Sequence, residues 1–450
     1  MNIRKYIGDE YFYKKVIRIA FPCALSQLLL SGRNIIVSIM VSSIGMVTAV
    51  GNAHNILNLH NYIMYGIQAG AALFGAQFFG ARQYRNMART QGAFLILAFI
   101  NVVIWNVVVF GFGREFLLFY LNDPSLVEYS LSYLKLVMPS LFLLVITMSF
   151  KTMYQCMHKT RLTFAESALY VLLNLINNYL FIFVFRLGIK GAGYASLLTE
   201  ILCCLAMVTY TLKDRPAFYL GIKAMLDFDA NFVEPYIQKI LPICFNEILF
   251  GFGESLFNKA YGMLGTSSME AIYIGSEILH LALFICWGYG EAVSILVGTL
   301  LGEGRIEQAK EESRYHLGMS FIVGLGLWAF MAMLSPAFLK LYNITDPVIY
   351  DSCMQLLFVY GFKAFLRVFT YVMFCTLKAG GDSRIYNLLD SGIMYAIGIP
   401  LAFGGVYLGI RDVVTLVLIC QIEQVVRFFL TLKRYNSYKW ANNLTKLVNT

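Results

Sequence analysis

The feature that most constrains this chain is a succession of apolar runs, each long enough to cross a lipid bilayer as a helix, which takes roughly twenty apolar residues. Twelve such runs lie near residues 16–43, 50–78, 90–112, 131–153, 165–186, 190–212, 238–263, 270–300, 316–336, 350–377, 386–408 and 412–432. Only 14% of the residues are charged, whereas about a quarter would be charged in a soluble chain. We therefore expect an all-α polytopic membrane protein of twelve transmembrane helices.

The basic residues predict the orientation of these spans. An even number of spans places both termini on one side of the membrane. If the N-terminus is cytoplasmic, the loops on that side hold 25 lysines and arginines and the opposite loops hold 5. Cytoplasmic loops are enriched in these residues, so we expect a plasma-membrane protein with both termini in the cytoplasm. The same distribution explains the net charge of +9 without a nucleic-acid partner.

An internal repeat divides the chain into two halves. The longest polar connection between spans lies near residues 213–234, at the middle of the chain. A shift of 220 places Pro22 on Pro242 and Gln27 on Glu247. We expect an N-lobe over residues 1–213, a cytoplasmic linker over 214–236 and a C-lobe over 237–450. Six helices in each half make the repeats parallel in topology, related by a pseudo-two-fold axis along the membrane normal, with a cleft between the lobes.

Polar residues within the spans are the candidates for function, because each is costly in hydrocarbon. Glu247 and Glu254 share one face of a predicted helix. With Asp390 they could take up a proton, and the two glutamates could also hold Na⁺, since carboxylates are hard ligands whose charge changes on protonation. The alternative is structural: each glutamate hydrogen-bonds a serine or the backbone, and Asp390 caps a helix or pairs with Arg384.

Further polar residues form stripes that fit the lining of a cavity: Gln27, Asn34, His54, Asn58, Asn61, Gln68, Asn174, Asn258, Glu277, His280 and Glu291. Lys363 and Arg367 lie four residues apart on one predicted helix. Two interpretations remain open for this basic pair: neutralisation of nearby glutamates, or binding of an anionic or zwitterionic substrate. Enzyme motifs such as GxSxG, HExxH and the P-loop are absent from the sequence, so an enzyme is not expected.

Several segments together resemble the multidrug and toxic compound extrusion (MATE) family. They are GAALFGAQFFGAR at residues 70–82, Pro242 followed by Asn246 and Glu247, and LKAGGDSR at residues 377–384. The resemblance covers nearly the whole chain. It implies a V-shaped, two-lobed antiporter that exports organic compounds in exchange for Na⁺ or protons by alternating access.

The sequence departs from the family at its acidic positions. The aspartate that many members carry in the first helix falls on Val37, an acid of the sodium-coupled branch falls near Arg367, and the acid of the seventh helix falls near Phe250. We therefore hypothesise that ion coupling involves Glu247, Glu254 and Asp390 instead.

The sequence as a whole predicts a secondary active exporter of small organic compounds. The alternative is a lipid-linked saccharide flippase of the same wider superfamily, favoured by Arg33, Lys363 and Arg367 within the spans. The expected partners are a small organic substrate and the lipid bilayer, for a monomer without a cofactor other than the coupling ion.

Overall fold

The computed structural model describes residues 3–121, 123–341 and 347–448, and in this part of the chain helices and their connections are the secondary structure, without a β-strand. The long N-terminal helices are α1 (Glu10–Ser42), α2 (Val47–Gly80), α3 (Tyr84–Tyr120), α4 (Pro124–Cys156), α5 (Thr160–Tyr179, continued by the π-helical turn Leu180–Val184) and α6 (Gly188–Asp214). After the short α7 (Ile222–Met225) come α8 (Ala230–Gly262), α9 (Thr266–Gly302), α10 (Ile306–Leu341) and α11 (Pro347–Ala379). One further segment joins α12 (Ser383–Asn387) through two π-helical turns, η3 (Leu388–Gly392) and η4 (Met394–Gly398), to α13 (Ile399–Tyr407), and α14 (Val413–Asn436) follows.

Eleven helices of the described residues are long and apolar enough to cross a membrane. The exception among the long helices is α2, whose 34 residues include polar side chains such as Asn52, His60 and Gln77. These side chains lower its hydropathy without shortening it. With α2 the helices match the predicted all-α, polytopic architecture, and the protein is a multi-pass membrane protein.

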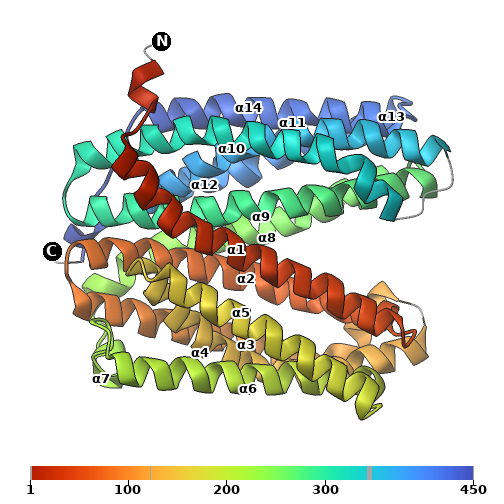
Figure 1. Cartoon of the computed structure of the whole chain (residues 1–450), viewed down its shortest axis with the longest axis horizontal. Helices are drawn as coiled ribbons and strands as arrows, with labels where there is room; N and C mark the ends of the chain where they lie inside the picture. Colours follow the sequence, from red (N-terminus) through yellow and green to blue (C-terminus); the bar gives the residue numbers. More distant parts are fainter. Residues whose placement is uncertain (1–2, 122, 342–346, 449–450) are drawn as a thin grey trace.

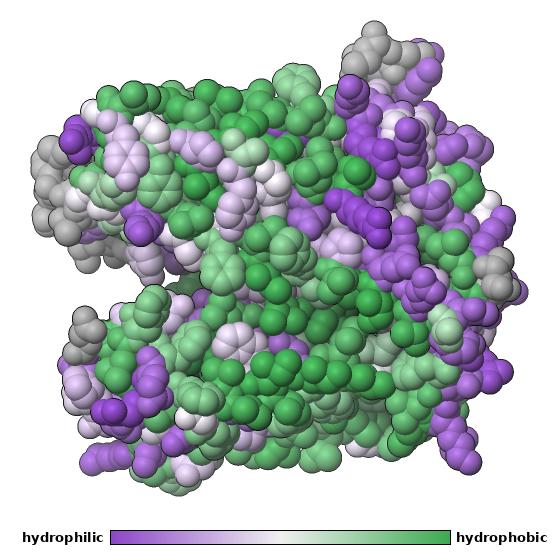
Figure 2. All heavy atoms as spheres, turned by 180° about the vertical axis from the view of Figure 1, so that it is seen from behind, coloured by the Kyte–Doolittle hydropathy of each residue, from purple (hydrophilic) through white to green (hydrophobic). Residues whose placement is uncertain are grey.

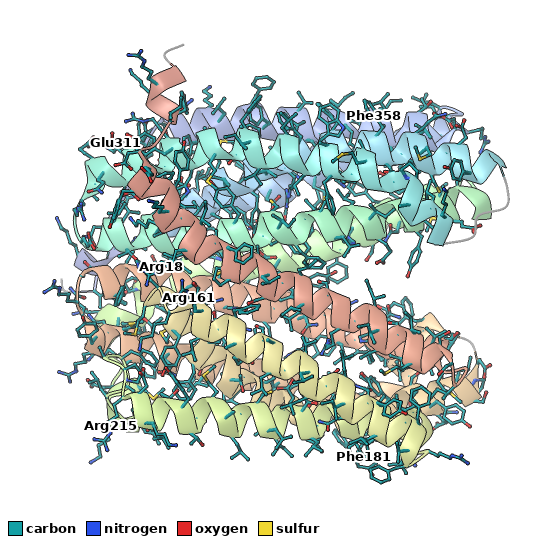
Figure 3. All side chains as sticks on the ribbon, in the orientation of Figure 1. Arg18, Arg161, Phe181, Arg215, Glu311 and Phe358 are labelled. Atoms are coloured by element: carbon teal, nitrogen blue, oxygen red, sulfur yellow. The ribbon has the colours of Figure 1, made fainter. Side chains whose placement is uncertain are left out.

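The helices form two lobes, an N-lobe of α1–α6 and a C-lobe of α8–α14, joined by residues 215–229 (Figure 1). Both termini lie at the same end of the molecule, named the terminal end below. Hydrophilic residues gather at this end in Figure 2, and a hollow opens between the lobes at the opposite end. Arg18, Arg161, Arg215 and Glu311 all lie at the terminal end (Figure 3).

Aspartates start the helices at matching positions of the two lobes. The backbone N–H of Phe12 donates to the Asp9 carboxylate at 2.8 Å at the start of α1, and Phe232 N–H donates to Asp229 at 2.8 Å at the start of α8. Each cap satisfies a donor that has no partner within the helix. Asp9 and Asp229 are 220 residues apart, so the repeat in the sequence is also a repeat in local structure.

Close backbone contacts join the lobes along a seam formed by α1, α2, α8 and α9. A Cβ atom added to Gly66 of α2 would lie 2.5 Å from the Cα of Cys244 in α8. The helices α1 and α9 make the equivalent contact: a Cβ atom added to Gly288 of α9 would lie 2.3 Å from the Cα of Ala24 in α1. Only glycine permits these approaches, and the two contacts are related by the repeat.

The seam reaches the terminal end, where the last glycines of α2 and α9 meet. A Cβ on Gly80 would lie 2.1 Å from the carbonyl oxygen of Thr299, and one on Gly302 would lie 1.9 Å from that of Gln77. Lobe contact in the terminal half and a hollow in the other half give the V shape.

The segment after α14 closes over the seam at the terminal end. The buried side-chain amide of Gln77 donates to the carbonyl oxygens of Ala379 at 2.7 Å and Asn442 at 3.2 Å. Its side-chain oxygen accepts from the backbone N–H of Leu444 at 2.7 Å. Residues 437–448 therefore link the N-lobe to the C-lobe.

Candidate functional site

The C-lobe contains a buried network of charged residues centred on Asp390, which lies in the π-helical turn η3 and is 3% exposed. Its carboxylate pairs with Arg367 of α11 at 3.1 Å and with Arg427 of α14 at 3.7 Å. Arg427, 1% exposed, also pairs with Glu423 one turn earlier on α14. Two arginines therefore face two carboxylates, and the network is neutral when all four groups are charged.

Hydrogen bonds from α8 fix the irregular backbone around Asp390. The amide of Asn246 donates to Asp390 at 3.3 Å and to the Tyr386 hydroxyl at 2.7 Å. Its side-chain oxygen accepts from the Ser391 hydroxyl at 2.6 Å and from the Ser391 backbone N–H at 3.2 Å. A π-helical turn frees backbone groups from the regular helical pattern, and within a membrane such groups need partners from neighbouring helices.

Glu247 lies beside this network at the edge of the seam. Its half-buried carboxylate accepts a hydrogen bond from Tyr386 at 3.2 Å. The buried ammonium of Lys378 lies 4.8 Å from the centre of the Tyr386 ring. Tyr386 thus connects Glu247, Asp390 and Asn246 in one hydrogen-bonded group.

The N-lobe holds a different polar group, formed by Arg33 of α1, Tyr170 of α5 and Glu200 of α6. The Arg33 guanidinium donates to the Tyr170 hydroxyl at 2.8 Å, and Tyr170 also interacts with Glu200. Glu200 is 4% exposed, and its Oε2 has no hydrogen-bond partner. Nearby, Lys151 of α4 pairs with Glu166 of α5 at 2.8 Å.

One polar contact and one close packing contact connect the lobes where the seam meets the cleft. The amide of Gln27 in α1 donates to Glu291 in α9 at 3.0 Å. Tyr62 of α2 lies against α8, because a Cβ on Gly251 would be 2.3 Å from its ring. Gly251 stands midway between Glu247 and Glu254, whose backbones are about 10 Å apart along the helix. The carboxylates of Glu247 and Glu254 therefore lie in different surroundings.

The structure separates the remaining predicted residues into groups. Most side chains that are exposed or half-buried lie toward the cleft ends of the four seam helices: Asn34, His54, Asn58, Asn61, Glu254, Asn258, Glu277 and His280. The half-buried Gln68 lies in the terminal half of α2, beyond Gly66. Asn174 is instead buried in the N-lobe and accepts from Asn178 at 3.1 Å. Arg367 belongs to the Asp390 network, whereas Lys363, one turn away, lies 5.8 Å from the centre of the Tyr360 ring.

The sequence left two structural alternatives for Asp390, a helix cap or a pair with Arg384, and the structure shows neither. Asp390 pairs with Arg367 and Arg427 rather than with Arg384, and it lies inside a continuous helical segment rather than at a cap. Sequence reasoning missed Glu166, Glu200, Glu423 and Arg427 as members of buried groups. All four lie within predicted spans, and their charge in hydrocarbon is the signal that could have identified them.

The described residues contain no group of three or more His, Cys, Asp or Glu side chains that could hold a metal ion. The buried carboxylates of Asp390 and Glu423 are instead paired with arginine side chains. The arrangement can bind polar organic groups and exchange protons.

Comparison with known proteins gives a consistent result. The MatE family model matches residues 22–180 and 242–403. Multidrug and toxin extrusion protein 1 of Oryctolagus cuniculus is 21% identical over 437 residues, which cover 94% of this chain and 75% of that protein. A probable multidrug resistance protein NorM of Haemophilus ducreyi is 24% identical over 353 residues, covering 74% and 73%. A solved outward-facing structure of a multidrug resistance MATE family transporter of the MOP superfamily has a TM-score of 0.86 at 18% identity, covering 97% of this chain and 98% of that one.

Proposed function

This chain belongs to the MatE family of transporters, and we propose that it is a secondary active antiporter that exports small organic compounds in exchange for protons by alternating access. In this proposal the terminal end faces the cytoplasm and the protein resides in the plasma membrane. The observation that carries the proposal is the asymmetric contact between the lobes. They touch through glycines in the terminal half and separate into a hollow in the other half, which is one end state of such a cycle.

The charge distribution favours protons over Na⁺ as the coupling ion. Asp390 lies between two arginines, and these fixed cations occupy the position that a bound Na⁺ would need. Glu247 and Glu254 are half-buried on α8, and neither forms an ion pair within 4.0 Å among the described residues. We assign proton uptake to these two glutamates and a positioning role to Asp390.

The cavity residues support a substrate that is organic and at least partly cationic. The flippase alternative rests on Arg33, Lys363 and Arg367. Arg33 donates to Tyr170 and Arg367 pairs with Asp390, so two of the three cations already have partners. The acidic side chains Glu254, Glu277 and Glu291 remain near the seam and cleft ends of α8 and α9.

The test is transport by the full chain in proteoliposomes. We expect uptake of a fluorescent organic cation driven by an imposed proton gradient and not by a Na⁺ gradient. Glu247→Gln and Glu254→Gln together should abolish gradient-driven uptake while binding of the dye persists. Glu10→Gln is the matched control, because Glu10 is an exposed glutamate paired only with Lys14 on the same helix.

Two outcomes would contradict the proposal. Full proton-driven transport by the double variant would remove the glutamates from coupling. Transport of a lipid-linked saccharide without any response to organic cations would favour the flippase.

A further inference from the structure

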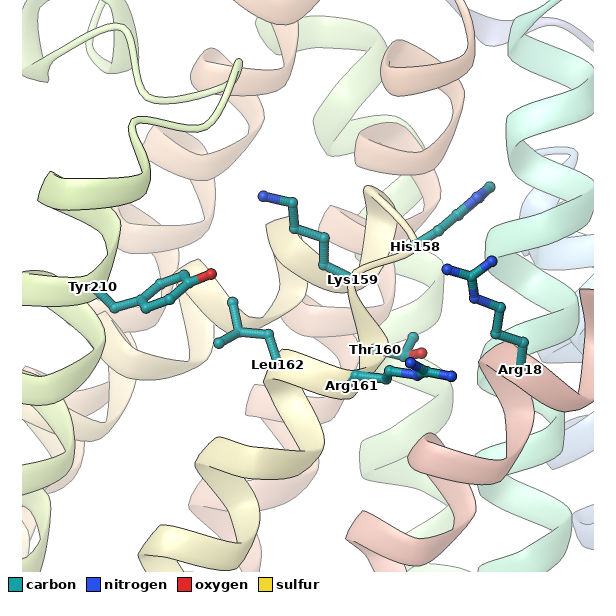
Figure 4. A pocket seen from close by; sticks show the side chains of 7 residues that line it. All are labelled: Arg18, His158, Lys159, Thr160, Arg161, Leu162 and Tyr210. Carbon is teal, nitrogen blue, oxygen red and sulfur yellow. The ribbon is translucent and has the colours of Figure 1, made fainter.

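A basic pocket lies at the terminal end of the N-lobe, away from the cleft. Its volume is about 290 Å³, and it is lined by Arg18, His158, Lys159, Thr160, Arg161, Leu162 and Tyr210 (Figure 4). Its walls come from three places: α1, the turn from α4 into α5, and α6. The volume is roughly ten times the ~30 Å³ that a water molecule occupies in the liquid, so a group of several heavy atoms fits.

The positive charge of the pocket lacks a matching negative charge. Lys159 pairs with Asp214 at 2.8 Å. Arg18 and Arg161 form no ion pair within 4.0 Å among the described residues. Arg18 extends from α1 toward His158, and Arg161 extends from α5 toward α1 (Figure 4). Burial lowers the pKa of His158 to about 4, so its imidazole is neutral at pH 7. Two like charges therefore face one cavity, an arrangement that an anion would stabilise.

The geometry of these groups selects the kind of anion. Guanidinium groups present planar, two-pronged donor sets that match phosphate oxygens. The pocket also adjoins the first turn of α5, where Lys159 provides no side-chain cap. Uncapped N–H groups at a helix start favour anions as well.

The surroundings point to a lipid rather than a soluble molecule. Ile17 and Phe21, which flank Arg18 on α1, are 54% and 63% exposed. Tyr210 of the pocket is exposed too. The pocket thus lies where exposed apolar side chains of α1 and α6 meet the hydrophilic terminal end. Basic pockets between helices at this level bind phospholipid headgroups.

The turn that forms the floor of the pocket has an unusual residue. Four turns at the terminal end share one hydrogen-bond pattern, with a left-handed residue at Arg82, His158, Gly304 and Gly381. The C-lobe has glycine at both of its positions, which is the residue that this conformation favours. His158 instead keeps a side chain there, and its Nε2 lies 3.1 Å from the Thr299 hydroxyl of the C-lobe. The pocket therefore adjoins a contact between the lobes.

We propose that this pocket binds the phosphate group of an anionic membrane phospholipid through Arg18 and Arg161, next to the contact of His158 with the C-lobe. This site lies outside the cleft, and it does not depend on the substrate or coupling ion of the transporter. It makes an anionic lipid a ligand of the N-lobe at the seam.

The test uses the full chain purified and exchanged into phosphatidylcholine with or without phosphatidylglycerol, and counts retained lipid by native mass spectrometry. We expect the wild type to retain phosphatidylglycerol in preference to phosphatidylcholine. Arg18→Gln and Arg161→Gln should each weaken retention about fivefold, as expected for one basic residue at a lipid surface. Arg215→Gln is the matched control, because Arg215 is an exposed arginine at the same end that does not line the pocket.

Further measurements distinguish a lipid phosphate from a soluble phosphate and a loss of binding from a loss of folding. Inorganic phosphate should not displace the lipid at millimolar concentration; displacement with the same dependence on Arg18 and Arg161 would assign the pocket to a soluble anion and overturn the lipid proposal. Equal retention by wild type and by the Arg18→Gln, Arg161→Gln double variant would also overturn it. Arg18→Lys and Arg161→Lys keep the charge and the fold, and should bind between the wild type and the glutamine variants.

Discussion

The two lobes share a backbone plan but hold polar residues in the membrane interior in different ways. In the C-lobe, Asp390 and Glu423 are paired with Arg367 and Arg427. In the N-lobe, Arg33 donates to a neutral tyrosine, and one oxygen of the buried Glu200 has no hydrogen-bond partner. Asn174 of the N-lobe stands in a segment, Leu172-Leu173-Asn174, that resembles Leu388-Leu389-Asp390, and it is held by another amide, Asn178.

The difference shows which parts of a duplicated fold are free to diverge. Caps, turns and inter-lobe glycines recur at spacings of 220 to 223 residues, because each satisfies a requirement of the backbone. The interior charges do not recur. A charge network is costly to bury and must be complete, whereas amides such as Asn174 and Asn178 satisfy each other locally. The C-lobe is therefore expected to tolerate less change at its centre than the N-lobe.

The largest predicted effect is the loss of an arginine from the C-lobe network. Arg427→Leu leaves Asp390 and Glu423 with too little positive charge in a buried site, which should destabilise the protein by about 3–5 kcal/mol. Arg33→Leu removes hydrogen bonds to two neutral groups, Tyr170 and Asn34, and should cost only about 1–2 kcal/mol. Thermal unfolding in detergent, with both variants measured beside the wild type, checks this ranking.

A compensated variant tests the reason for that ranking. Removing both members of the pair, as Glu423→Leu with Arg427→Leu, should recover part of the stability lost by Arg427→Leu alone. Equal destabilisation by Arg33→Leu and Arg427→Leu would contradict the contrast between the lobes.

A smaller loss of stability, of about 1–3 kcal/mol, is expected at the inter-lobe glycines, where the two lobes are most alike. Gly66→Ala and Gly288→Ala each force a methyl group against backbone atoms of the other lobe. Because the repeat relates the two contacts, both variants should slow transport and lower the melting temperature to a similar extent. Gly51→Ala, at a position of α2 with no atom within 4 Å of the added Cβ, should leave both unchanged. A strong effect of only one seam variant would show that the lobes do not share the contact equally.

The same contrast explains how much the sequence could predict. Twelve apolar runs and a parallel repeat were sufficient for the number of helices and the two lobes, since both follow from periodic hydropathy and backbone geometry. The pair Glu423 and Arg427 is local, four residues apart on one helix. The other partners of the buried charges were not predictable, because they lie far apart in sequence: Arg367 and Asp390 are 23 residues apart, and Gln27 and Glu291 are 264 apart. Glu200 stood in a predicted span, but nothing nearby in the sequence marked Tyr170 and Arg33 as its neighbours.

The ends of α2 and α9 provide the next comparison. Gln77 and Thr299 are both in the last turn before the inter-lobe glycines. Gln77→Ala removes three hydrogen bonds, leaves the Leu444 N–H without its acceptor, and should destabilise the protein by about 2 kcal/mol. Thr299→Val removes two contacts, with His158 and with the carbonyl oxygen of Ile295, but leaves no backbone N–H without its acceptor and should cost less. Limited proteolysis of residues 437–448 should accelerate in Gln77→Ala only; unchanged cleavage in that variant would show that the tail is held by other contacts.

The smallest effect is expected in the linker, residues 215–229, that follows the N-lobe. Exposed ion pairs hold this linker, whereas buried hydrogen bonds hold the C-terminal segment, residues 437–448. Hydrogen bonds from Arg85, at 2.5 Å, and from Arg89, at 3.0 Å, lower the pKa of Asp227 below its ordinary value. A lowered folded pKa means that the contribution to stability is complete above the ordinary value near 4. It is lost as the pH falls through the lowered value. Hydrogen exchange of residues 215–229 should therefore be insensitive to Asp227 protonation from pH 7 to 5 and should speed up below about pH 4, whereas Asp227→Asn should be fast throughout. The C-terminal segment is held at Gln77 without a titrating group, so its hydrogen exchange should not speed up in this pH range. An equal acceleration there would contradict the distinction between the two segments.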